Sequence, residues 1–553
     1  MSTRKWNLLF PKTKKTQRTT QEVIDVLLKN RGIKTAKDRE EFLNTKLDSV
    51  TIEKVGIDIR EIKKTIKRIK DSIAKNEKII IYGDYDVDGI CGTAILWETL
   101  FKIHKNVMPH IPHRVDEGYG LSIKGIDHVL TEHPDTKLII TVDNGIVALG
   151  ATEYANKKGI DVIITDHHVA GEKLPSAYSI VHTTLLCGAG VALILSLAFE
   201  GVSHPEKNDP RLDLVALATV ADLVPLTKTN RAFVKSGLEV LRNTNRAGLL
   251  ALFEQVQIRK EEIDVYKIGH IIAPRLNASG RITHALDSLR LVCTKDLERA
   301  KKLAQGLGET NKARQAMTEE STSSADLITE NVTSDQKFIF VSSKKYNQGI
   351  IGLVASRLVE RHYRPTIVVS AGEEFSKGSA RSVAGFNIIE FIRSFSHLLV
   401  DAGGHPMAAG FTVETHRIEE LKVALIKSAD KLIDEKILER VIDIDMEIPF
   451  SAVNSEFYNQ IESLSPFGMA NPQPLFLSTN VTVENMMMVG RDRKHLKMNL
   501  SQNGKSLEAI LFRAEESKLR VGDVMDVVYV IDEDTWNGNR KIVLKIRDVK
   551  TVS

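Results

Sequence analysis

Three apolar segments in the N-terminal half of the chain each end in a cluster of carboxylates or histidines. The motif GDYDVDG occupies residues 83–89, DNG residues 143–145 and DHH residues 166–168. The segments before them, at 78–82, 137–142 and 161–165, have the length and composition of buried strands, and residues 107–111 resemble a fourth. Helical stretches near 90–102 and 146–157 alternate with these strands, a rhythm typical of a parallel α/β sheet. Because side chains beyond the carboxyl ends of parallel strands meet at one crevice, the sequence predicts an acidic crevice.

Carboxylates gathered in this way need cations. Five or six of them facing one crevice would repel each other unless bound ions neutralised them. An oxygen-rich ligand set with few imidazoles suits Mg²⁺ or Mn²⁺ better than zinc. Two such ions about 3.5–4 Å apart activate a water and stabilise the attacking and leaving oxygens of phosphodiester cleavage. We therefore expect two Mn²⁺ or Mg²⁺ ions, with Asp143 bridging them because it leaves a central strand.

The chain of 553 residues is too long for one hydrophobic core, so several domains are expected. A charged, helix-forming stretch with few glycines separates two α/β blocks, and a glycine-rich turn is expected at Gly403 and Gly404 in the second block. Alternating strand patterns after Pro474 predict a small β-barrel. The predicted boundaries are an N-terminal extension at 1–50, a catalytic domain at 51–290, a connecting helix at 291–335, a second α/β domain at 336–435 and the barrel with its lead-in segment at 436–553.

Composition excludes some classes of protein. No run of 18 or more apolar residues could span a bilayer, so no membrane association is expected. Three scattered cysteines, Cys91, Cys187 and Cys293, lack the spacing of a zinc site or a disulfide framework and favour a reducing cytoplasm. The net charge of only +4 does not exclude nucleic acid, because acidic metal ligands offset basic phosphate contacts in the total.

Taken together, the motifs resemble the DHH phosphoesterase superfamily, and within it the RecJ family of bacterial single-strand-specific 5′ to 3′ exonucleases. The similarity continues in order through PHR and EGYG at 112–120, LCGAGVA at 186–192, APRLNASGR at 273–281, GSARS at 378–382 and GGHP at 403–406. It covers most of the chain. The resemblance implies a DHH catalytic domain, a DHHA1 second domain and an OB-fold barrel, joined by a helix that shapes a channel for one strand.

The resemblance also implies roles for individual residues. The metal ligands would be Asp84, Asp86, Asp88, Asp143, His167 and Asp222. Catalytic roles would fall to His168 and His405 beside the phosphate and to the bridging Asp143. The nucleic-acid contacts would be Arg114, Arg275, Asn277, Arg281, Arg314, Ser379, Arg381, Ser382, Gly403, Gly404 and His405.

Elementary chemistry supports several of these roles and leaves alternatives open. Arginines such as Arg114 and Arg381 grip phosphate oxygens bidentately, and glycines let backbone amides approach a phosphate. Arg275 and Arg281 could instead anchor their loop through salt bridges, and Arg314 could be a solvated helix residue. Gly403 and Gly404 could simply form a turn.

The C-terminal barrel offers basic and aromatic residues suited to a sequence-tolerant single-strand groove. The basic set is Arg491, Arg493, Lys494, Lys497, Lys541, Lys545 and Arg547, and the aromatic set is Phe476, Phe512, Tyr529 and Trp536. Since alternating strands bury aromatic side chains, at least half of the aromatic set is expected in the barrel core. No base specificity is expected, because stacking and phosphate contacts carry little base information.

Two positions depart from the family pattern. Tyr346 and Asn347 stand where Trp-His is usual, which puts in doubt a substrate contact there. His182 and Thr183 stand where Asn-Pro is usual, in a segment expected to be a loop that affects stability more than chemistry.

The expected function is therefore a two-metal exonuclease that degrades single-stranded DNA in the 5′ to 3′ direction, in DNA repair and recombination. A cytoplasmic monomer is expected, with a single-strand-binding protein or a helicase as a candidate partner. One alternative is a DHH phosphodiesterase for nanoRNA or cyclic dinucleotides, although those relatives generally lack the roughly 80 residues that follow Pro474. The other is an inactive scaffold, like the eukaryotic replication factor that resembles this family, although every acidic ligand position is filled.

Overall fold

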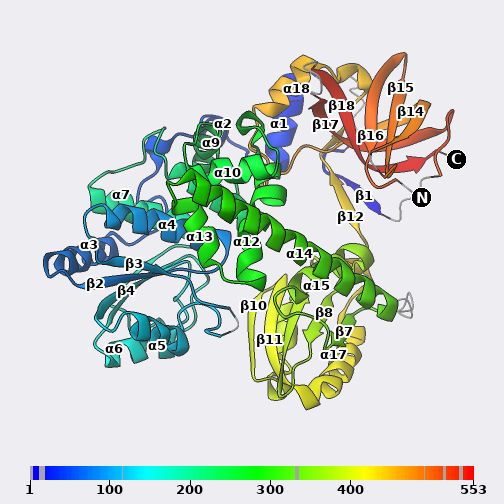
Figure 1. The fold of residues 1–553 in the computed structure, drawn as a ribbon. Coiled ribbons are helices and arrows are strands. Elements are labelled where there is room, and N and C mark those ends of the chain that lie inside the picture. The colour runs from blue at the N-terminus through cyan, green and yellow to red at the C-terminus, as the bar shows by residue number, and fades with distance from the viewer. Residues whose placement is uncertain are drawn as a thin grey trace. The chain divides into compact units, whose positions relative to one another are not determined.

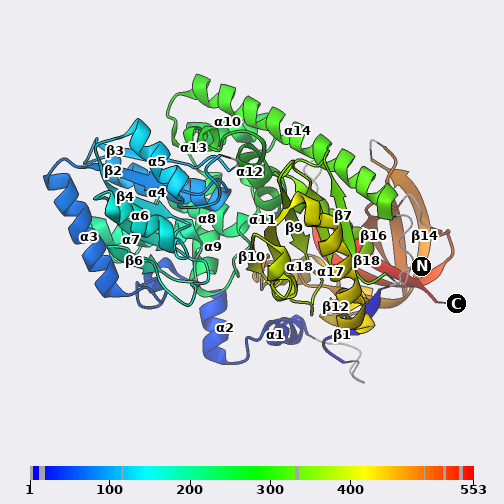
Figure 2. The ribbon, with the colours of Figure 1, turned by 90° about the horizontal axis from the view of Figure 1, so that it is seen from below.

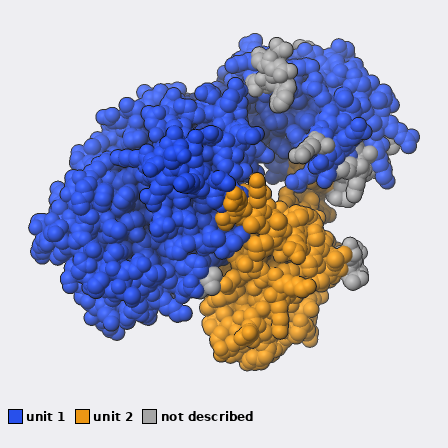
Figure 3. All heavy atoms as spheres, in the orientation of Figure 1, with its two compact units in different colours: residues 1–2, 7–308, 443–553 blue, residues 3–6, 309–442 orange. Residues whose placement is uncertain are grey.

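The computed structural model describes residues 4–11, 19–114, 116–329, 336–490, 492–514, 518–534 and 540–552. The chain divides into two compact units, coloured separately in Figure 3. The first contains residues 1–2, 7–308 and 443–553, and the second contains residues 3–6 and 309–442. Over the described ranges, none of the helices is long and apolar enough to cross a membrane.

The first unit is built around a five-stranded parallel sheet with the strand order β3-β2-β4-β5-β6. The strands are β2 (Lys78–Tyr82), β3 (Val107–His110), β4 (Thr136–Val142), β5 (Asp161–Asp166) and β6 (Ser179–His182). The four expected strands and their parallel pairing are confirmed. Strand β6 was not expected, because its pattern of burial alternates and lacks the continuous apolar run of the others.

Helices cover both faces of this sheet, as Figure 1 shows for α4 and α7 on one side and α5 and α6 on the other. The pleat of β2 divides its side chains between two cores: Ile79 and Ile81 face one layer, and Ile80 and Tyr82 face the other. The first layer contains α3 (Ile59–Ala74), α4 (Val87–Phe101), α7 (Gly188–Glu200), α8 (Leu212–Ala221), α9 (Lys228–Arg242), α10 (Ala247–Gln255) and α13 (Leu286–Cys293). The second contains α5 (Ile123–Glu132) and α6 (Leu149–Lys157).

A continuous helical segment follows α10 and ends beside the loop of residues 83–89 after β2, which carries three predicted metal ligands and is called the metal-binding loop. It consists of α11 (Val265–Lys267), a π-helical turn at Ile268–Ile272 and α12 (Ala273–Ile282). The predicted connecting helix is α14 (Leu297–Thr329).

The C-terminal part of the first unit is a closed barrel, which confirms the expected OB-fold. Its strands are β14 (Phe476–Val489), β15 (His495–Gln502), β16 (Lys505–Leu511), β17 (Val524–Asp534) and β18 (Lys541–Thr551), with β13 (Met446–Glu447) added beside β14. Pairing of β14 with β17 closes the barrel. Phe476 and Tyr529 are fully buried in its core, whereas Phe512 is exposed and packs against the ring of His495. Residues 491 and 536, also predicted to bind nucleic acid, lie outside the described residues.

The N-terminal segment packs against this barrel. Helices α1 (Thr20–Asn30) and α2 (Ala36–Leu43) share a hydrophobic core with the barrel and α18 (Ser455–Glu462). Arg231 of α9 is fully buried and donates hydrogen bonds to the carbonyls of Phe42 (2.8 Å) and Ser465 (2.8 Å). These contacts join the N-terminal segment, the barrel lead-in and the α/β core into one unit.

The second unit is a mixed sheet with the order β10-β11-β9-β8-β7. Its elements are β7 (Ile339–Ser343), α15 (Ile351–His362), β8 (Thr366–Ser370), β9 (Phe375–Arg381), α16 (Ile388–Arg393), β10 (Asp401–His405), β11 (Ala408–Glu414) and α17 (Ile418–Leu432). The expected glycine turn was wrong: Gly403 and Gly404 lie within β10 and the hairpin turns after His405, which pairs with Ala408. The two glycines lie in a strand because β10 pairs with the antiparallel strand β11, and two consecutive glycines in the sequence do not indicate that pairing. A separate two-stranded ribbon contains β1 (Lys5–Leu8) and β12 (Val441–Ile444).

Candidate metal centre and nucleic-acid interface

The loop after β2 orients three carboxylates through backbone hydrogen bonds. Asp84 accepts a bond from its neighbour's N–H (2.7 Å), and Asp86 caps α4 by accepting one from Gly89 (3.0 Å). Asp88 lies in the first turn of α4 and accepts bonds from the N–H groups of Gly188 (2.6 Å) and Ala189 (2.7 Å), at the start of α7. The positive ends of two helices therefore face these acids.

Two glycines permit this close packing of backbone and carboxylate. A Cβ at Gly89 would lie 2.6 Å from the Cα of Asp84, and one at Gly188 would lie 2.6 Å from the Cβ of Asp143. Any larger residue at either position would displace a predicted metal ligand.

Asp143 occupies a strained position at the end of β4. Its φ of 65° lies in the left-handed region, which a non-glycine residue adopts only where its surroundings impose it. The next residue, Asn144, donates to the carbonyls of Tyr82 (3.2 Å) and Val142 (2.9 Å) and so ties the end of β4 to β2. In this conformation Oδ1 of Asp143 lies 3.0 Å from Nε2 of His167.

Two buried atoms in the crevice have no hydrogen-bond partner among the described residues: Oδ1 of Asp143 and Nε2 of His167. They are 3.0 Å apart, and Nε2 of His167 is also 3.6 Å from carboxylate oxygens of Asp88 and Asp222. Burial lowers the pKa of His167, so the imidazole is neutral near pH 7 and presents a lone pair. Buried polar atoms without partners are costly, and a cation coordinated by both atoms would remove that cost.

All six predicted ligands fall into three overlapping groups whose ligand atoms lie within 4.8 Å of one another. The groups are Asp84-Asp86-Asp143, Asp88-His167-Asp222 and Asp143-His167-His168. Five carboxylates and one imidazole fit divalent cations that prefer oxygen ligands. Because the groups share Asp143 and His167, together they would serve two neighbouring ions. Two such ions would supply an activated water and charge stabilisation for phosphoester hydrolysis.

Asp84, Asp143 and Asp222 hold protons more tightly than ordinary carboxyl groups in the metal-free protein. Burial, and next the charge of Asp86, raises the pKa of Asp84 to about 8. Burial and the charges of Asp88 and Asp86 raise the pKa of Asp222 to about 8 and that of Asp143 well above its ordinary value. Metal binding must therefore release protons.

His168 is oriented by the first residue of its own motif. Its Nδ1 lies 2.8 Å from Oδ1 of Asp166. The same oxygen accepts a hydrogen bond from the backbone N–H of His167 (2.7 Å), and Oδ2 of Asp166 accepts one from the N–H of Ile146 (2.9 Å). Burial opposes protonation of His168, but the bond to Asp166 outweighs it and raises the pKa of His168 to about 9. His168 is therefore a cation at neutral pH, held beside the predicted metal ligands.

Sequence reasoning assigned no role to Asp166 or to Tyr119, whose hydroxyl lies 3.3 Å from Nε2 of His168. Their only signal was membership of the DHH and EGYG motifs. The expectation that His182 lies in a loop was wrong. It ends β6, and its Nε2 is 2.7 Å from the carbonyl oxygen of His168, so this departure from the family pattern adjoins the crevice.

Hydrogen bonds account for a second cluster of histidines, in which His110 and His128 lie on either side of Glu117. Glu117 lies 2.9 Å from Nε2 of His110 and 3.1 Å from Nδ1 of His128, and it accepts a bond from the backbone N–H of His113 (2.9 Å). Unlike Asp143, both of its oxygens have partners. Glu117 instead holds the loop that carries Arg114 and Tyr119.

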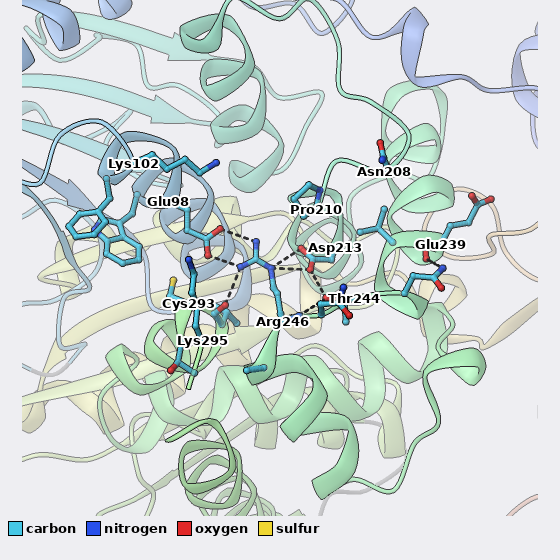
Figure 4. Close-up of a pocket in the computed structure, with 18 of the residues that line it drawn as sticks. Glu98, Lys102, Asn208, Pro210, Asp213, Glu239, Thr244, Arg246, Cys293 and Lys295 are labelled. Carbon is cyan, nitrogen blue, oxygen red and sulfur yellow. Dashed lines mark hydrogen bonds and ion pairs between the residues drawn. The ribbon is translucent and has the colours of Figure 1, made fainter. Parts of the chain in front are cut away.

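A cavity of about 1280 Å³ in the first unit is drawn in Figure 4, and none of the predicted metal ligands is among the residues that line it. Arg246 stands at its centre and bonds to Glu98 (2.6 Å) and Asp213 (3.0 Å). Glu98 is eleven residues beyond Val87 on α4, about 16 Å along the helix. The cavity is therefore at the opposite end of α4 from the metal-binding loop.

Comparisons with known proteins agree with this arrangement. Family models match residues 78–219 (DHH family, N-terminal domain), 335–435 (DHHA1 domain) and 444–548 (RecJ OB domain). The single-stranded-DNA-specific exonuclease RecJ of Bacillus subtilis is 36% identical over 562 residues, covering 98% of this chain and 70% of its own length. The chain belongs to the RecJ family.

Other members of the RecJ family extend the match. RecJ of Haemophilus influenzae is 29% identical, with 96% of each chain covered. The crystal structure of Thermus thermophilus RecJ in complex with Mn²⁺ superposes with a TM-score of 0.82 at 27% identity, covering 99% of this chain and 80% of that one. A crystal structure of the same protein in complex with Mg²⁺ gives 0.77 at 26% identity.

In the first unit, the RecJ-like motif on α12 contacts the metal-binding loop. Asn277 accepts a hydrogen bond from the N–H of Val87 (2.9 Å), and a Cβ at Gly280 would lie 2.5 Å from the carbonyl oxygen of Tyr85. The guanidinium of Arg114 lies 5.1 Å from the ring centroid of Tyr85. Burial raises the pKa of Tyr85, and the charge of Arg281, on the same helix, lowers it by a smaller amount. These residues therefore surround the loop, and their contacts with DNA remain predictions.

Arg275 on α12 is anchored by neutral acceptors: its Nε donates to Gln255 (3.1 Å) and a terminal nitrogen to the carbonyl of Ile271 (2.7 Å). Its role in DNA binding also remains a prediction.

The remaining predicted contacts lie in the second unit. Arg381 donates to the hydroxyl of Ser379 (3.3 Å) on β9, and Ser382 is buried and donates to the carbonyl of Phe386 (2.6 Å). Arg314 on α14 donates to Asn311 (3.2 Å). Gly403, Gly404 and His405 are exposed on β10, an edge strand of the sheet. Gly404 has a φ of 144°, and a Cβ there would lie 2.3 Å from the carbonyl oxygen of Ala408. These residues thus lie on the edge strand β10, on or just after the interior strand β9, and on α14, and their roles stay predictions.

Proposed function

We propose that this chain is a two-metal exonuclease that hydrolyses single-stranded DNA from its 5′ end, with Mn²⁺ or Mg²⁺ as cofactor. The observation that carries the proposal is the pair of buried, unpartnered atoms, Asp143 Oδ1 and His167 Nε2, at the centre of five carboxylates. Membership of the RecJ family supports the substrate and the 5′ to 3′ direction.

The chain's own groups have separable roles. Asp84, Asp86, Asp88, His167 and Asp222 would hold the ions with Asp143, which belongs to two of the three ligand groups and so suits the bridging position. His168, held as a cation by Asp166, would neutralise charge on the scissile phosphate.

Other residues would act on the substrate strand. His405 would contact the phosphate from the second unit. Arg381, Ser379 and the glycines of β10 would guide the strand. The OB-fold barrel would bind the strand further from its end, through basic residues and the exposed ring of Phe512.

The test is digestion of four substrates with Mn²⁺ present: 5′-labelled and 3′-labelled single strands, a duplex and a dinucleotide. We expect mononucleotides released from the 5′ end of single strands, and no product after chelation of the metal. Release from the 3′ end would overturn the polarity.

The same digestion separates the alternatives. Cleavage of the dinucleotide alone would point to a phosphodiesterase for short substrates. Absence of cleavage by the wild type would point to a scaffold.

Finer properties belong to the proposal as well. We propose that the enzyme acts in DNA repair and recombination, as a cytoplasmic monomer, with a single-strand-binding protein or a helicase as partner. The family membership and the OB-fold support action on single strands during such processes. Light scattering of the purified chain tests the monomer, and the sensitivity of a deletion strain to DNA damage tests the cellular role.

A further inference from the structure

An exposed pair of stacked rings, Tyr266 and His270, lies on the helical segment that leads to the metal-binding loop. The ring centroids are 4.3 Å apart and the planes differ by 16°. Nδ1 of His270 lies 3.1 Å from the carbonyl oxygen of Tyr266, which holds the imidazole in this orientation. The Tyr266 side chain is 63% exposed, so the outer face of the pair is available to a flat ligand.

The helical segment places this pair between two parts of the substrate path. It runs without a break from Val265 to Ile282, about 27 Å at 1.5 Å per residue. Its carboxyl end carries Asn277 and Gly280, which contact the metal-binding loop. Its amino end adjoins the barrel lead-in, because a Cβ on Gly468 would lie 3.5 Å from the side chain of Val265.

The π-helical turn that carries His270 packs against α8, whose carboxyl end precedes a predicted metal ligand. A Cβ on Gly269 in this turn would lie 3.8 Å from the side chain of Val220, which precedes Asp222 by two residues in the last turn of α8. Leu223 follows Asp222 and is 64% exposed. Met469 is also exposed, and its carbonyl accepts a hydrogen bond from the N–H of Leu226 (2.8 Å), so the lead-in contributes an apolar side chain nearby.

Apolar and aromatic side chains gathered at a surface indicate a binding site, and π-helical turns are frequent at functional sites. A protein partner would need a larger, self-contained patch, whereas a parallel pair of rings suits a planar base. Asp264, the nearest acid in sequence, is occupied in capping α11, where it accepts a bond from the N–H of Lys267 (2.7 Å). We infer that Tyr266 and His270 form a stacking platform for one base of the single strand, between the barrel and the metal centre.

This inference rests on the proposed function and adds a base-binding position to it. The platform would hold the strand after it leaves the barrel, so that the next nucleotides lie along α12 toward the metal-binding loop. Stacking is tolerant of base identity, since every base has a flat face, and so it would not impose sequence preference.

The experiment uses the full chain and a 5′-phosphorylated 20-mer whose terminal linkages are phosphorothioate to slow cleavage. A single 2-aminopurine is moved along the strand one position at a time, and its fluorescence reports stacking on an aromatic ring. For the wild type we expect one register at which binding quenches the fluorescence beyond the neighbouring positions. That minimum should vanish in the double variant Tyr266→Ala with His270→Ala, and it should persist when both are replaced by Phe, which keeps the rings.

Steady-state kinetics supply the second readout. The ratio of kcat/KM for an unmodified 20-mer to that for a trinucleotide should fall about five- to tenfold in the double alanine variant, through KM. Tyr154→Ala, a tyrosine on α6 over the other face of the sheet, is the matched control and should leave this ratio unchanged.

An unchanged fluorescence register and an unchanged ratio in the double alanine variant would overturn the platform and assign the pair to helix stability or protein contact. Failure of the wild type to degrade the 20-mer would instead overturn the proposed function.

Discussion

Replacing Asp143 by asparagine should make the metal-free protein more stable while abolishing its activity. Among the residues that the structure describes, neither Oδ1 of Asp143 nor Nε2 of His167 has a hydrogen-bond partner in the metal-free crevice, and the two atoms lie 3.0 Å apart. A carboxyl at this position donates to the imidazole only while it holds a proton, whereas an amide donates at any pH and would pair with the imidazole lone pair. The replacement would also remove a group whose ionised form the charges of Asp88, Asp86 and Asp84 oppose.

The size of the effect follows from these contacts. Satisfying two buried polar atoms contributes about 1–3 kcal/mol to the free energy of unfolding. For a domain of this size that corresponds to a melting temperature higher by a few degrees, roughly 2 °C per kcal/mol. With saturating metal the wild type should be more stable than the variant, because a ligand at a hundred times its Kd adds about 2.7 kcal/mol to the free energy of unfolding of the wild type. The variant lacks the bridging carboxylate and should gain little.

The assay is thermal melting of Asp143→Asn and wild type with EDTA and with saturating Mn²⁺, beside digestion of end-labelled single-stranded DNA. Asp166→Asn is the matched control, since Asp166 accepts bonds from the backbone N–H groups of Ile146 and His167 and is not a predicted ligand. The control should lose stability with EDTA and still gain stability with Mn²⁺. A metal-free Asp143→Asn protein that melts below the wild type, or one that keeps the full Mn²⁺ response, would refute the reasoning.

Three further predictions concern the first unit. Burial and the charges of Asp532 and Asp264 raise the pKa of Glu462 from 4.5 to about 7. The protonated carboxyl therefore makes its full contribution to the free energy of unfolding below pH 4.5, and this contribution is lost as pH rises through 7. Melts at pH 5 and pH 8 should show Glu462→Gln more stable than wild type at the higher pH only, by roughly 3 kcal/mol at most. Arg231→Met should lower the free energy of unfolding by about 2–3 kcal/mol in urea titrations, because it leaves buried carbonyls without donors; an unchanged midpoint would contradict this. Glu117→Gln should lower kcat about tenfold, because the loop that carries Tyr119 loses its anchor. Digestion assays measure kcat, and circular dichroism should show an unchanged fold. Full activity would rule out that anchoring role.

Local sequence patterns were sufficient to predict the central strands and the set of acids that meet at the crevice. The continuous apolar runs of β2, β4 and β5 can only be satisfied by burial on both faces, so a parallel sheet follows, and strand-end acids then share one crevice. The paired glycines of β10 escaped prediction because glycine is uncommon inside strands, although their partners lie close by in the same hairpin. Strand β6 escaped prediction because its hydrogen bonds come from β5, a separate segment of the chain. The packing of α1 on the barrel core was hidden for the same reason.

The sequence by itself determined which residue types meet at the crevice, since composition and spacing are local properties. Only the tertiary structure decided which of their atoms remain available. Asp166 and Asp143 both follow buried strands in the same sheet, yet the oxygens of Asp166 accept bonds from three backbone N–H groups and His168, while Oδ1 of Asp143 has no partner among the described residues. The distinction between a residue that positions and one that ligates arises because hydrogen-bond partners are supplied by chain segments far apart in sequence, which the fold alone brings together.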